Sequence, residues 1–592
     1  MPPASQRNTK KERPKDAKGT MKRIWKYIIR YRAYVIIIAI LCISSNILSL
    51  IGPSLAGKAI QEAAAGKGQV NFANVFYYAK LMLIFYITAS ALTLLINILM
   101  MNVGRRIARQ LRTDVFNKMM KLKVSYFDTN AAGDIISRVS YDIDVLSTSI
   151  STDLVSIMTN VITVFGSLFM MIYISPLLAL TVLVTIPLSV VYIRFMGRKT
   201  RPLHAKRSAA YGKLNGFVEE MFSGQKTIQS YAQEDPVTEK FETINTEASD
   251  AFHWANHYGM TMGPTLGSIN NLGLALIGMF GSVLYLKDLV NLAQISSFVL
   301  YSRKFSGPIN EIANIVNEIY SALAASERVF YMLDAEEEPA DAENALELTD
   351  IEGNVAIKDV NFGYVPEKLI LHDFTLDAPA GKLVAIVGPT GAGKTTVINL
   401  LMRFYDVNSG EITVDGHEIR TLTRKSLRHS FSMVLQDTWL INGTIFENIA
   451  YGKEGATRDE VVAAAKAARI HHFIMQLPEG YDTVISEDGG NISKGQKQML
   501  TIARAMLYDS KMLILDEATS NVDTDTERQI QSAMRQLMAD KTCFVIAHRL
   551  STIQNADKII VVNDGRIIEQ GTHSQLMGMK GFYHKLYASQ FE

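Results

Sequence analysis

Long apolar runs separated by polar segments fill the first half of the chain. A helix needs about 20 predominantly apolar residues to cross a bilayer. Six runs approach this length, and we predict a membrane-spanning helix in each: residues 34–51, 77–101, 154–175, 177–196, 264–286 and 289–306. The sixth run is the weakest candidate, because Asn291, Gln294, Arg303 and Lys304 interrupt it.

The apolar runs end in the first half, and beyond Leu333 the pattern is that of a soluble, mixed α/β protein. We therefore predict a multi-domain membrane protein, in which an all-α six-helix transmembrane domain is followed by an α/β domain. The predicted parts are a disordered cytoplasmic tail over 1–20, a transmembrane domain over 21–332 and a soluble domain over 333–592.

Two long polar segments join the second run to the third and the fourth run to the fifth. They predict helices that continue into the cytoplasm and turn back. Asp128 and Gly133 suit a cap or turn at the tip of the first segment, and Pro236 suits a helix stop in the second. By themselves these hairpins are either solvated tips or segments that touch the soluble domain.

Positive charge is distributed unevenly around the apolar runs. Lys and Arg are frequent before the first run, after the second and after the fourth, whereas the other connections contain only Lys58, Lys67 and Lys287. The positive-inside rule then predicts that both termini are cytoplasmic. The first run is too long and lies too far into the chain for a cleaved signal peptide.

Composition narrows the possible functions. The 592 residues are 48% hydrophobic and 20% charged, and a net charge of +2 does not favour nucleic-acid binding. Cys42 and Cys543 are far apart, which predicts neither a disulfide framework nor a zinc site.

Four asparagines lie within the apolar runs: Asn46, Asn160, Asn270 and Asn271. Polar side chains at membrane depth form hydrogen bonds between helices or face a cavity. The pattern favours contacts between helices but leaves contact with a ligand open. No acidic residue lies deep in an apolar run, so a proton relay has little support.

The segment VAIVGPTGAGKTTVINLL in the second half reads as an apolar strand, a glycine-rich loop and a helix. Its loop fits the P-loop pattern through Gly388, Gly391, Gly393, Lys394 and Thr395. In such a loop backbone N–H groups and the helix N-terminus cradle phosphate, the lysine adds charge, and the threonine hydroxyl binds Mg²⁺.

A second motif, KMLILDEATS, follows the P-loop at a distance. Met512–Leu515 predicts a buried parallel strand, and Asp516 at its end is placed to hold Mg²⁺. The adjacent Glu517 is a candidate general base for the attacking water. Together with the P-loop, the motif predicts ATP hydrolysis, with ATP and Mg²⁺ as cofactors.

The order of these motifs resembles the ATPase of ATP-binding cassette (ABC) transporters. A glutamine in SMVLQDTWL, the segment GGNISKGQ, the segment LILDE and a histidine in FVIAHRLS follow the P-loop. With six apolar runs on the same chain, the sequence resembles a half-transporter of the ABC exporter group from about residue 21 onward. The resemblance makes 333–592 the nucleotide-binding domain and the two hairpins coupling helices that contact it.

The resemblance also assigns roles to individual residues. It implies that Tyr364 stacks on adenine, that Gln436 reaches Mg²⁺ and the attacking water, and that His548 contacts the γ-phosphate. Glu517, His548 and Gln436 are then the catalytic residues, and Thr395, Gln436 and Asp516 hold the metal. The implied nucleotide contacts are Tyr364, Gly388, Thr390, Gly391, Gly393, Lys394, Thr395, Thr396, Ser493, Lys494, Gly495, Gln496 and Asp523.

Lys494 departs from the pattern of the family, in which the signature reads roughly Leu-Ser-Gly-Gly-Gln. Here it reads Ile492, Ser493, Lys494, Gly495, Gln496. A lysine in place of glycine can obstruct the loop or change its conformation, since glycine permits close approach and unusual backbone angles. The other motifs keep the pattern of the family.

In this family each ATP site combines the P-loop of one chain with the signature of its partner. The chain is therefore similar to one half of a heterodimeric bacterial exporter, with one competent and one degenerate ATP site. A homodimeric exporter or lipid flippase is the alternative, and an ATP-gated regulatory or channel-like protein is a rival from another class. The apolar runs argue against a soluble ABC ATPase, and a short N-terminal tail argues against a protease-bearing exporter.

The substrate itself is not defined by the sequence. We expect an amphipathic small molecule, a lipid or a peptide, a second half-transporter chain and membrane lipid as partners, and no nucleic acid. The layout favours a bacterial cytoplasmic membrane, crossed several times.

Overall fold

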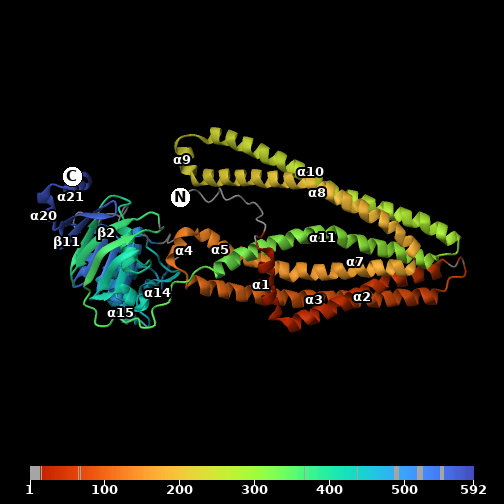
Figure 1. The fold of residues 1–592 in the computed structure, drawn as a ribbon, viewed down its shortest axis with the longest axis horizontal. Helices are drawn as coiled ribbons and strands as arrows, with labels where there is room; N and C mark the ends of the chain where they lie inside the picture. Colours follow the sequence, from red (N-terminus) through yellow and green to blue (C-terminus); the bar gives the residue numbers. More distant parts are fainter. Residues whose placement is uncertain are drawn as a thin grey trace. The chain divides into compact units, whose positions relative to one another are not determined.

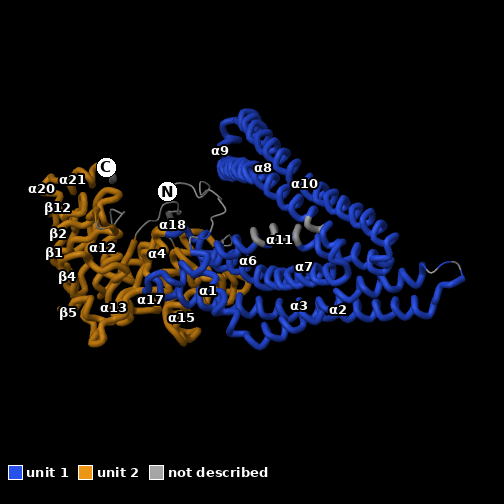
Figure 2. The backbone as a smooth tube through the Cα atoms, turned by 45° about the vertical axis from the view of Figure 1, so that its right-hand side comes forward, with its two compact units in different colours: residues 1–122, 130–337 blue, residues 123–129, 338–592 orange. Residues whose placement is uncertain are grey.

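The structure is a computed structural model. It describes residues 14, 16–64, 66, 68–365, 367–436, 438–485, 492–516, 524–546 and 553–591. The chain forms two compact units (Figure 2): unit 1 comprises residues 1–122 and 130–337, and unit 2 comprises residues 123–129 and 338–592.

Unit 1 is helical, and its helices follow one another with short connections (Figure 1). They are α1 (Ala17–Ile29), α2 (Arg32–Ala63), α3 (Phe72–Met119), α5 (Ala132–Ser137), α6 (Ile143–Thr148), α7 (Leu154–Ile174), α8 (Pro176–Ser223), α9 (Gln225–Ser230), α10 (Glu234–Leu286) and α11 (Leu292–Leu333). Two π-helical turns, Arg138–Asp142 and Ser149–Asp153, join α5, α6 and α7 into one continuous helical stretch.

Five of the described helical segments are long and apolar enough to cross a membrane. They are Arg32–Ala63, Phe72–Met119, Ala132–Ile174, Pro176–Ser223 and Glu234–Leu286. Each contains one of the first five predicted runs, except that the third run extends one residue beyond its helix, to Ser175. The sixth run lies mainly in α11, which is not among the five, so a sixth span stays a prediction.

Two of the polar residues that interrupt the sixth run, Asn291 and Gln294, form the N-terminal cap of α11. Asn291 is the N-cap: its side chain accepts a hydrogen bond from the backbone N–H of Gln294, whose side chain accepts one from the N–H of Asn291. This capping box satisfies donors that the first turn leaves unpaired. Beyond it, the buried Phe298, Tyr301 and Phe305 of α11 pack into a core shared with the other helices.

Unit 2 contains α4 (Val124–Thr129) and the whole α/β part of the chain. Its main sheet has the order β12-β11-β3-β10-β9-β6, parallel except for the edge strand β12. The strands are β3 (Leu383–Val387), β6 (Phe431–Val434), β9 (Met512–Asp516), β10 (Thr542–Ile546), β11 (Lys558–Asn563) and β12 (Arg566–Gly571).

Two antiparallel sheets complete the strands of unit 2. The larger has the order β2-β1-β4-β5, formed by β1 (Val355–Phe362), β2 (Leu371–Ala378), β4 (Ser409–Val414) and β5 (His417–Glu418). The smaller pairs β7 (Gly443–Thr444) with β8 (Val484–Ile485).

Unit 2 also contains helices beyond α4, some of which pack on the main sheet and some on other helices. They are α12 (Lys394–Leu401), α13 (Arg424–His429), α14 (Ile445–Ala450), α15 (Arg458–Ala467), α16 (His471–Gln476), α17 (Lys494–Tyr508), α18 (Thr524–Met538), α20 (His573–Met579) and α21 (Phe582–Phe591). Short 3₁₀ turns cover Ile419–Thr421 and Gly480–Asp482.

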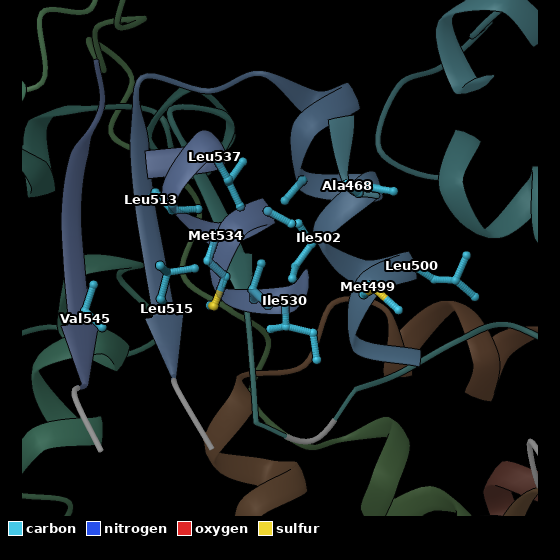
Figure 3. Packing of buried hydrophobic residues seen from close by; sticks show 14 of the residues in the cluster. Ala468, Met499, Leu500, Ile502, Leu513, Leu515, Ile530, Met534, Leu537 and Val545 are labelled. Atoms are coloured by element: carbon cyan, nitrogen blue, oxygen red, sulfur yellow. The ribbon is translucent and has the colours of Figure 1, made fainter. Parts of the chain in front are cut away.

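The core on one face of the main sheet lies between β9, β10, α17 and α18 (Figure 3). Leu513 and Leu515 of β9 point toward Met534 of α18, and Ile502 of α17 packs in the same buried cluster. β9 is almost continuously buried because both of its faces are covered, one by α17 and α18 and the other by α12 and the antiparallel sheet of β1, β2 and β4, as its unbroken apolar run predicts. Cys42 and Cys543 are both free and buried.

Candidate nucleotide site

The P-loop lies between β3 and α12 in the centre of the main sheet. Gly391 and Gly393 have φ angles of +83° and +103°, and Gly393 is the N-cap of α12. Gly388 has a φ of +155°, and a Cβ there would lie 2.1 Å from the carbonyl oxygen of Val562 in β11. The loop therefore needs glycine for conformation and close packing, and it presents the N-terminus of α12 to an anion.

Lys394 folds back over this loop. Its Nζ donates hydrogen bonds to the carbonyl oxygens of Gly388 at 2.8 Å and Pro389 at 2.9 Å. Burial lowers the pKa of Lys394, and the Asp516 carboxylate opposes that shift. The ammonium is thus held at the mouth of the loop, where phosphate oxygens would be stronger partners than neutral carbonyls.

Oxygen donors for a metal lie at the same edge of the sheet. Parallel strands end together at their carboxyl edge: Asp516 ends β9, and Gln436 follows the neighbouring β6 by two residues. Asp516 is half-buried, whereas Gln436 and Thr395 are exposed. Carboxylate, amide and hydroxyl oxygens form the ligand chemistry that suits Mg²⁺.

Three predicted site residues, Glu517, His548 and Asp523, lie outside the described residues. In the sequence, Glu517 directly follows β9 and His548 follows β10 by two residues.

Tyr364 lies beside the first turn of α12 and is 45% exposed. Its hydroxyl donates a hydrogen bond to Thr396 Oγ1 at 3.3 Å and accepts one from Asn399 Nδ2 at 3.1 Å. The ring stands edge-on to Phe362 and Tyr405, with centroid distances of 5.1 and 4.9 Å. An exposed aromatic face next to a P-loop is suited to stacking on a base.

We predict that Tyr364→Ala raises the KM for ATP about 10-fold, since base stacking on an aromatic ring contributes about 1–3 kcal/mol. Tyr364→Phe is the matched control, because it keeps the ring and removes only the hydroxyl that contacts Thr396 and Asn399. ATPase rates measured against ATP concentration check both variants. An unchanged KM in Tyr364→Ala would show that the ring does not contact the nucleotide.

The signature residues lie at the start of α17. Ser493 is its N-cap and accepts a hydrogen bond from the Gln496 N–H, while Gln496 Oε1 accepts one from the Ser493 N–H. Lys494 is the first helical residue and is exposed, whereas Gly495 is buried. Among the described residues, no hydrogen bond or ion pair joins this segment to the P-loop.

The structure describes the backbone at Lys494 itself, whereas residues 486–491 of the preceding loop lie outside the described residues. Position 494 belongs to an ordinary helical turn, without a left-handed backbone angle, and the capping box around it is intact. What the lysine adds is a long side chain and a positive charge at a helix N-terminus, where the helix dipole disfavours cations.

Arg504 is a positioning residue that the sequence motifs did not reveal. Its guanidinium donates to the carbonyl oxygens of Asn448 at 2.8 Å and Trp439 at 3.1 Å, and it lies over the Tyr451 ring. Trp439 is three residues after Gln436, so Arg504 anchors the chain shortly after the glutamine. Its place on α17, just beyond the signature, is the only signal in the sequence.

The helix α4 belongs to unit 2, together with the ATPase strands and helices. The Tyr405 hydroxyl donates a hydrogen bond to the Asp128 carboxylate of α4. Burial raises the pKa of Tyr405, and the bond to Asp128 raises it further. Since Tyr405 also touches Tyr364, a chain of contacts runs from the base-stacking candidate to α4.

We predict that Tyr405→Phe keeps basal ATPase within about twofold but weakens its stimulation by transported substrate, because the bond to α4 is lost. Asp128→Ala, which removes the acceptor, is expected to have the same effect. Tyr508→Phe, which removes a hydroxyl bonded to His429, is the matched control. Equal stimulation in all three variants would contradict a coupling role.

Polar residues of the membrane domain join its helices. Thr163 of α7 donates to Asn46 of α2 at 2.9 Å, and Asn160 of α7 donates to Glu311 of α11 at 3.1 Å. These contacts favour the helix–helix reading for the two asparagines. Asn270 is half-buried and Asn271 is exposed on α10.

The fold and site define a P-loop ATPase carried on the same chain as a helical membrane domain. Residues 35–309 match the ABC transporter transmembrane region, and residues 371–520 match the ABC transporter family. The chain belongs to the ABC transporter family. It is a multi-pass membrane protein whose ATPase domain binds nucleotide and couples ATP hydrolysis to transport.

Several relatives align over most of both chains. An ABC transporter ATP-binding protein of Bacillus subtilis, YfiC, is 42% identical over 583 residues, covering 98% of this chain and 96% of the relative. A fatty acid ABC transporter ATP-binding/permease protein of Mycobacterium tuberculosis is 43% identical over 522 residues, covering 88% and 82%. An ATP-dependent lipid A-core flippase of Vibrio cholerae is 34% identical over 581 residues, covering 97% and 98%.

A solved structure shows the same overall fold. The ATP-bound structure of a bacterial Atm1-family ABC exporter matches with a TM-score of 0.75 and 29% identity, covering 95% of this chain and 98% of the other. The chain therefore has the fold of an ABC exporter.

Proposed function

We propose that this chain is one half of a dimeric exporter that moves an amphipathic, lipid-like substrate across a bacterial cytoplasmic membrane by alternating access. The observation that carries the proposal is the similarity, over most of both chains, to proteins named a fatty acid transporter and a lipid flippase. Both termini are cytoplasmic in this proposal, in keeping with the cation-rich flanks.

The residues at the carboxyl edge of the sheet have separate roles in hydrolysis. Backbone N–H groups of the P-loop and Lys394 hold the phosphates, and Thr395, Asp516 and Gln436 hold Mg²⁺, which supplies charge neutralisation when bound. Glu517 accepts a proton from the attacking water, and His548 contacts the γ-phosphate.

We further propose that the dimer is asymmetric. Lys494 is exposed at the start of α17, on the segment that in this family faces the nucleotide of the partner. A partner chain with an intact signature then completes a competent site with this chain's P-loop and Glu517. Lys494 faces the partner's P-loop and makes the second site slow.

The tips of the two cytoplasmic hairpins, α4 and α9, serve as coupling helices in this proposal. The tail 1–20, the membrane domain 21–332 and the nucleotide-binding domain 333–592 remain the proposed division of the chain. The bond between Tyr405 and Asp128 supports the role of α4.

The asymmetric pair is tested by purifying the full chain alone and with candidate partner chains, and measuring ATPase rate and oligomeric mass. Low activity alone and gain with a partner are the expected results. An active homodimer would overturn the heterodimer and leave a homodimeric exporter or flippase. Passive substrate flux gated by ATP binding, without net export, would instead support the channel-like alternative.

A further inference from the structure

A cavity lined by both polar and apolar side chains lies inside unit 1, between α2, α3, α7 and α11. Its volume is about 380 Å³, and its wall includes Ser49, Tyr86, Ala89, Ile96, Val155 and Lys304. Cavities that bind small ligands have volumes of about 300–1,000 Å³. The cavity is therefore large enough for the head group of an amphiphile and the first part of its tail.

Lys304 brings a positive charge to this cavity. It lies 12 residues after Leu292, where α11 begins, which is about 18 Å along the helix at 1.5 Å per residue. If α11 crosses the membrane, this is near the middle of a hydrocarbon core about 30 Å thick. Ionisable residues at that depth are costly and tend to line substrate pathways.

The hydrogen bonds that Lys304 makes within the described residues are both to neutral groups. Its Nζ donates to the carbonyl oxygen of Ser49 at 2.6 Å and to Ser49 Oγ, both neutral partners. An ammonium has three donors, so one is left for a ligand. In the described part of the chain no carboxylate forms an ion pair with Lys304; Glu311, seven residues further along α11, accepts a bond from Asn160 instead.

Several other polar groups at this cavity already have partners. Ser45 Oγ donates to the Ala89 carbonyl at 2.9 Å, and Asn46 Oδ1 accepts from Thr163 at 2.9 Å. They hold the helices together and add no charge. The recognition chemistry that the cavity offers is the Lys304 cation, the hydroxyls of Tyr86 and Ser90, and apolar walls from Ile96 and Val155.

We propose that this cavity binds the head group of a carboxylate-bearing amphiphile, with Lys304 as its anion contact. A carboxylate oxygen would accept the remaining N–H of the Lys304 ammonium, and its negative charge would neutralise the positive charge in a low-dielectric site. The chain of such an amphiphile begins against the apolar wall. This inference rests on the proposed export of a lipid-like substrate and specifies its chemical class.

The test measures binding of radiolabelled palmitate to the purified full-length chain in nanodiscs of neutral phosphatidylcholine without nucleotide. We expect Lys304→Met to weaken palmitate binding about 10-fold or more, and Lys304→Arg to retain it. Arg303→Met is the matched control, since Arg303 is the exposed neighbouring cation and does not line the cavity. Lys304→Gln provides a second neutral variant if Lys304→Met does not fold.

Competition experiments identify the head group. Palmitate binding should be displaced by oleate but not by hexadecanol or palmitate methyl ester, which lack the charge. Equal displacement by the uncharged compounds, or an equal loss in Arg303→Met, would overturn the proposal. Stronger displacement by phosphatidylglycerol than by oleate would also overturn it, because the ligand would then be a phospholipid phosphate.

Palmitate binding and amphiphile-stimulated ATPase distinguish a failure of the Lys304 site from a failure of the exporter function. Binding is measured without nucleotide, so it does not depend on catalysis. Amphiphile-stimulated ATPase that persists in Lys304→Met would preserve the exporter function and remove only the role of Lys304.

Discussion

Replacing Glu517 with glutamine is expected to lower the ATPase rate about 100-fold or more while ATP binding persists. Removal of a general base costs about 10²–10⁴ in rate, whereas the amide keeps the size and most of the polarity of the side chain. The P-loop and Lys394, which hold the phosphates in our proposal, are unaffected. The measurements are steady-state phosphate release and equilibrium binding of a fluorescent ATP analogue.

Lys394→Met is the control that separates binding from chemistry. It removes the ammonium that now bonds to Gly388 and Pro389, so both ATP binding and ATPase activity should fall. A Glu517→Gln variant that loses binding to the same extent would argue for a structural role of Glu517. Nearly full activity in Glu517→Gln would place the general base elsewhere.

Replacing Lys494 with glycine, which restores the signature of the family, is expected to have the second large effect on the ATPase rate. Lys494→Gly should raise the ATPase rate of the chain alone about 10-fold. The reason is that the Lys494 side chain, near the phosphoryl group being transferred, would no longer disturb stabilisation of the transition state. The measurement is the ATPase rate of the purified chain without a partner, at saturating ATP.

Lys494→Ala tests why the lysine matters. Position 494 has an ordinary helical conformation at the start of α17, so it does not require glycine for its backbone. We therefore expect alanine to restore activity as well as glycine does. Restoration by glycine alone would mean that backbone freedom is needed in the closed dimer, and no gain in either variant would contradict a slow site caused by Lys494.

The apolar pattern predicted where most of the membrane helices lie but not where they end. The run 77–101 is the apolar part of α3, which continues to Met119, and the run 264–286 is the end of α10, which begins at Glu234. Hydropathy detects only the part of a helix that lipid or a core surrounds. The long polar parts are held by contacts with other helices.

For the ATPase, local motifs were sufficient to predict the strand, loop and helix around Lys394 and the buried strand before Asp516. This is because a P-loop needs glycine at fixed spacing, and a covered parallel strand needs an unbroken apolar run. Arg504, by contrast, lies in a helix with no special pattern. Its role arises only from the carbonyl oxygens of Asn448 and Trp439, which lie more than 50 residues away in the chain.

The sequence by itself determined the class of this protein, because phosphate binding and membrane insertion are local properties of short segments. Only the tertiary structure decided which polar residues of the membrane domain are paired with one another. Asn46 is hydrogen-bonded to Thr163, and Asn160 is hydrogen-bonded to Glu311. Lys304 is hydrogen-bonded only to neutral groups of Ser49 among the described residues, and it lines a cavity. The physical reason is that compensation of a buried charge depends on groups brought together from distant helices, which no local pattern encodes.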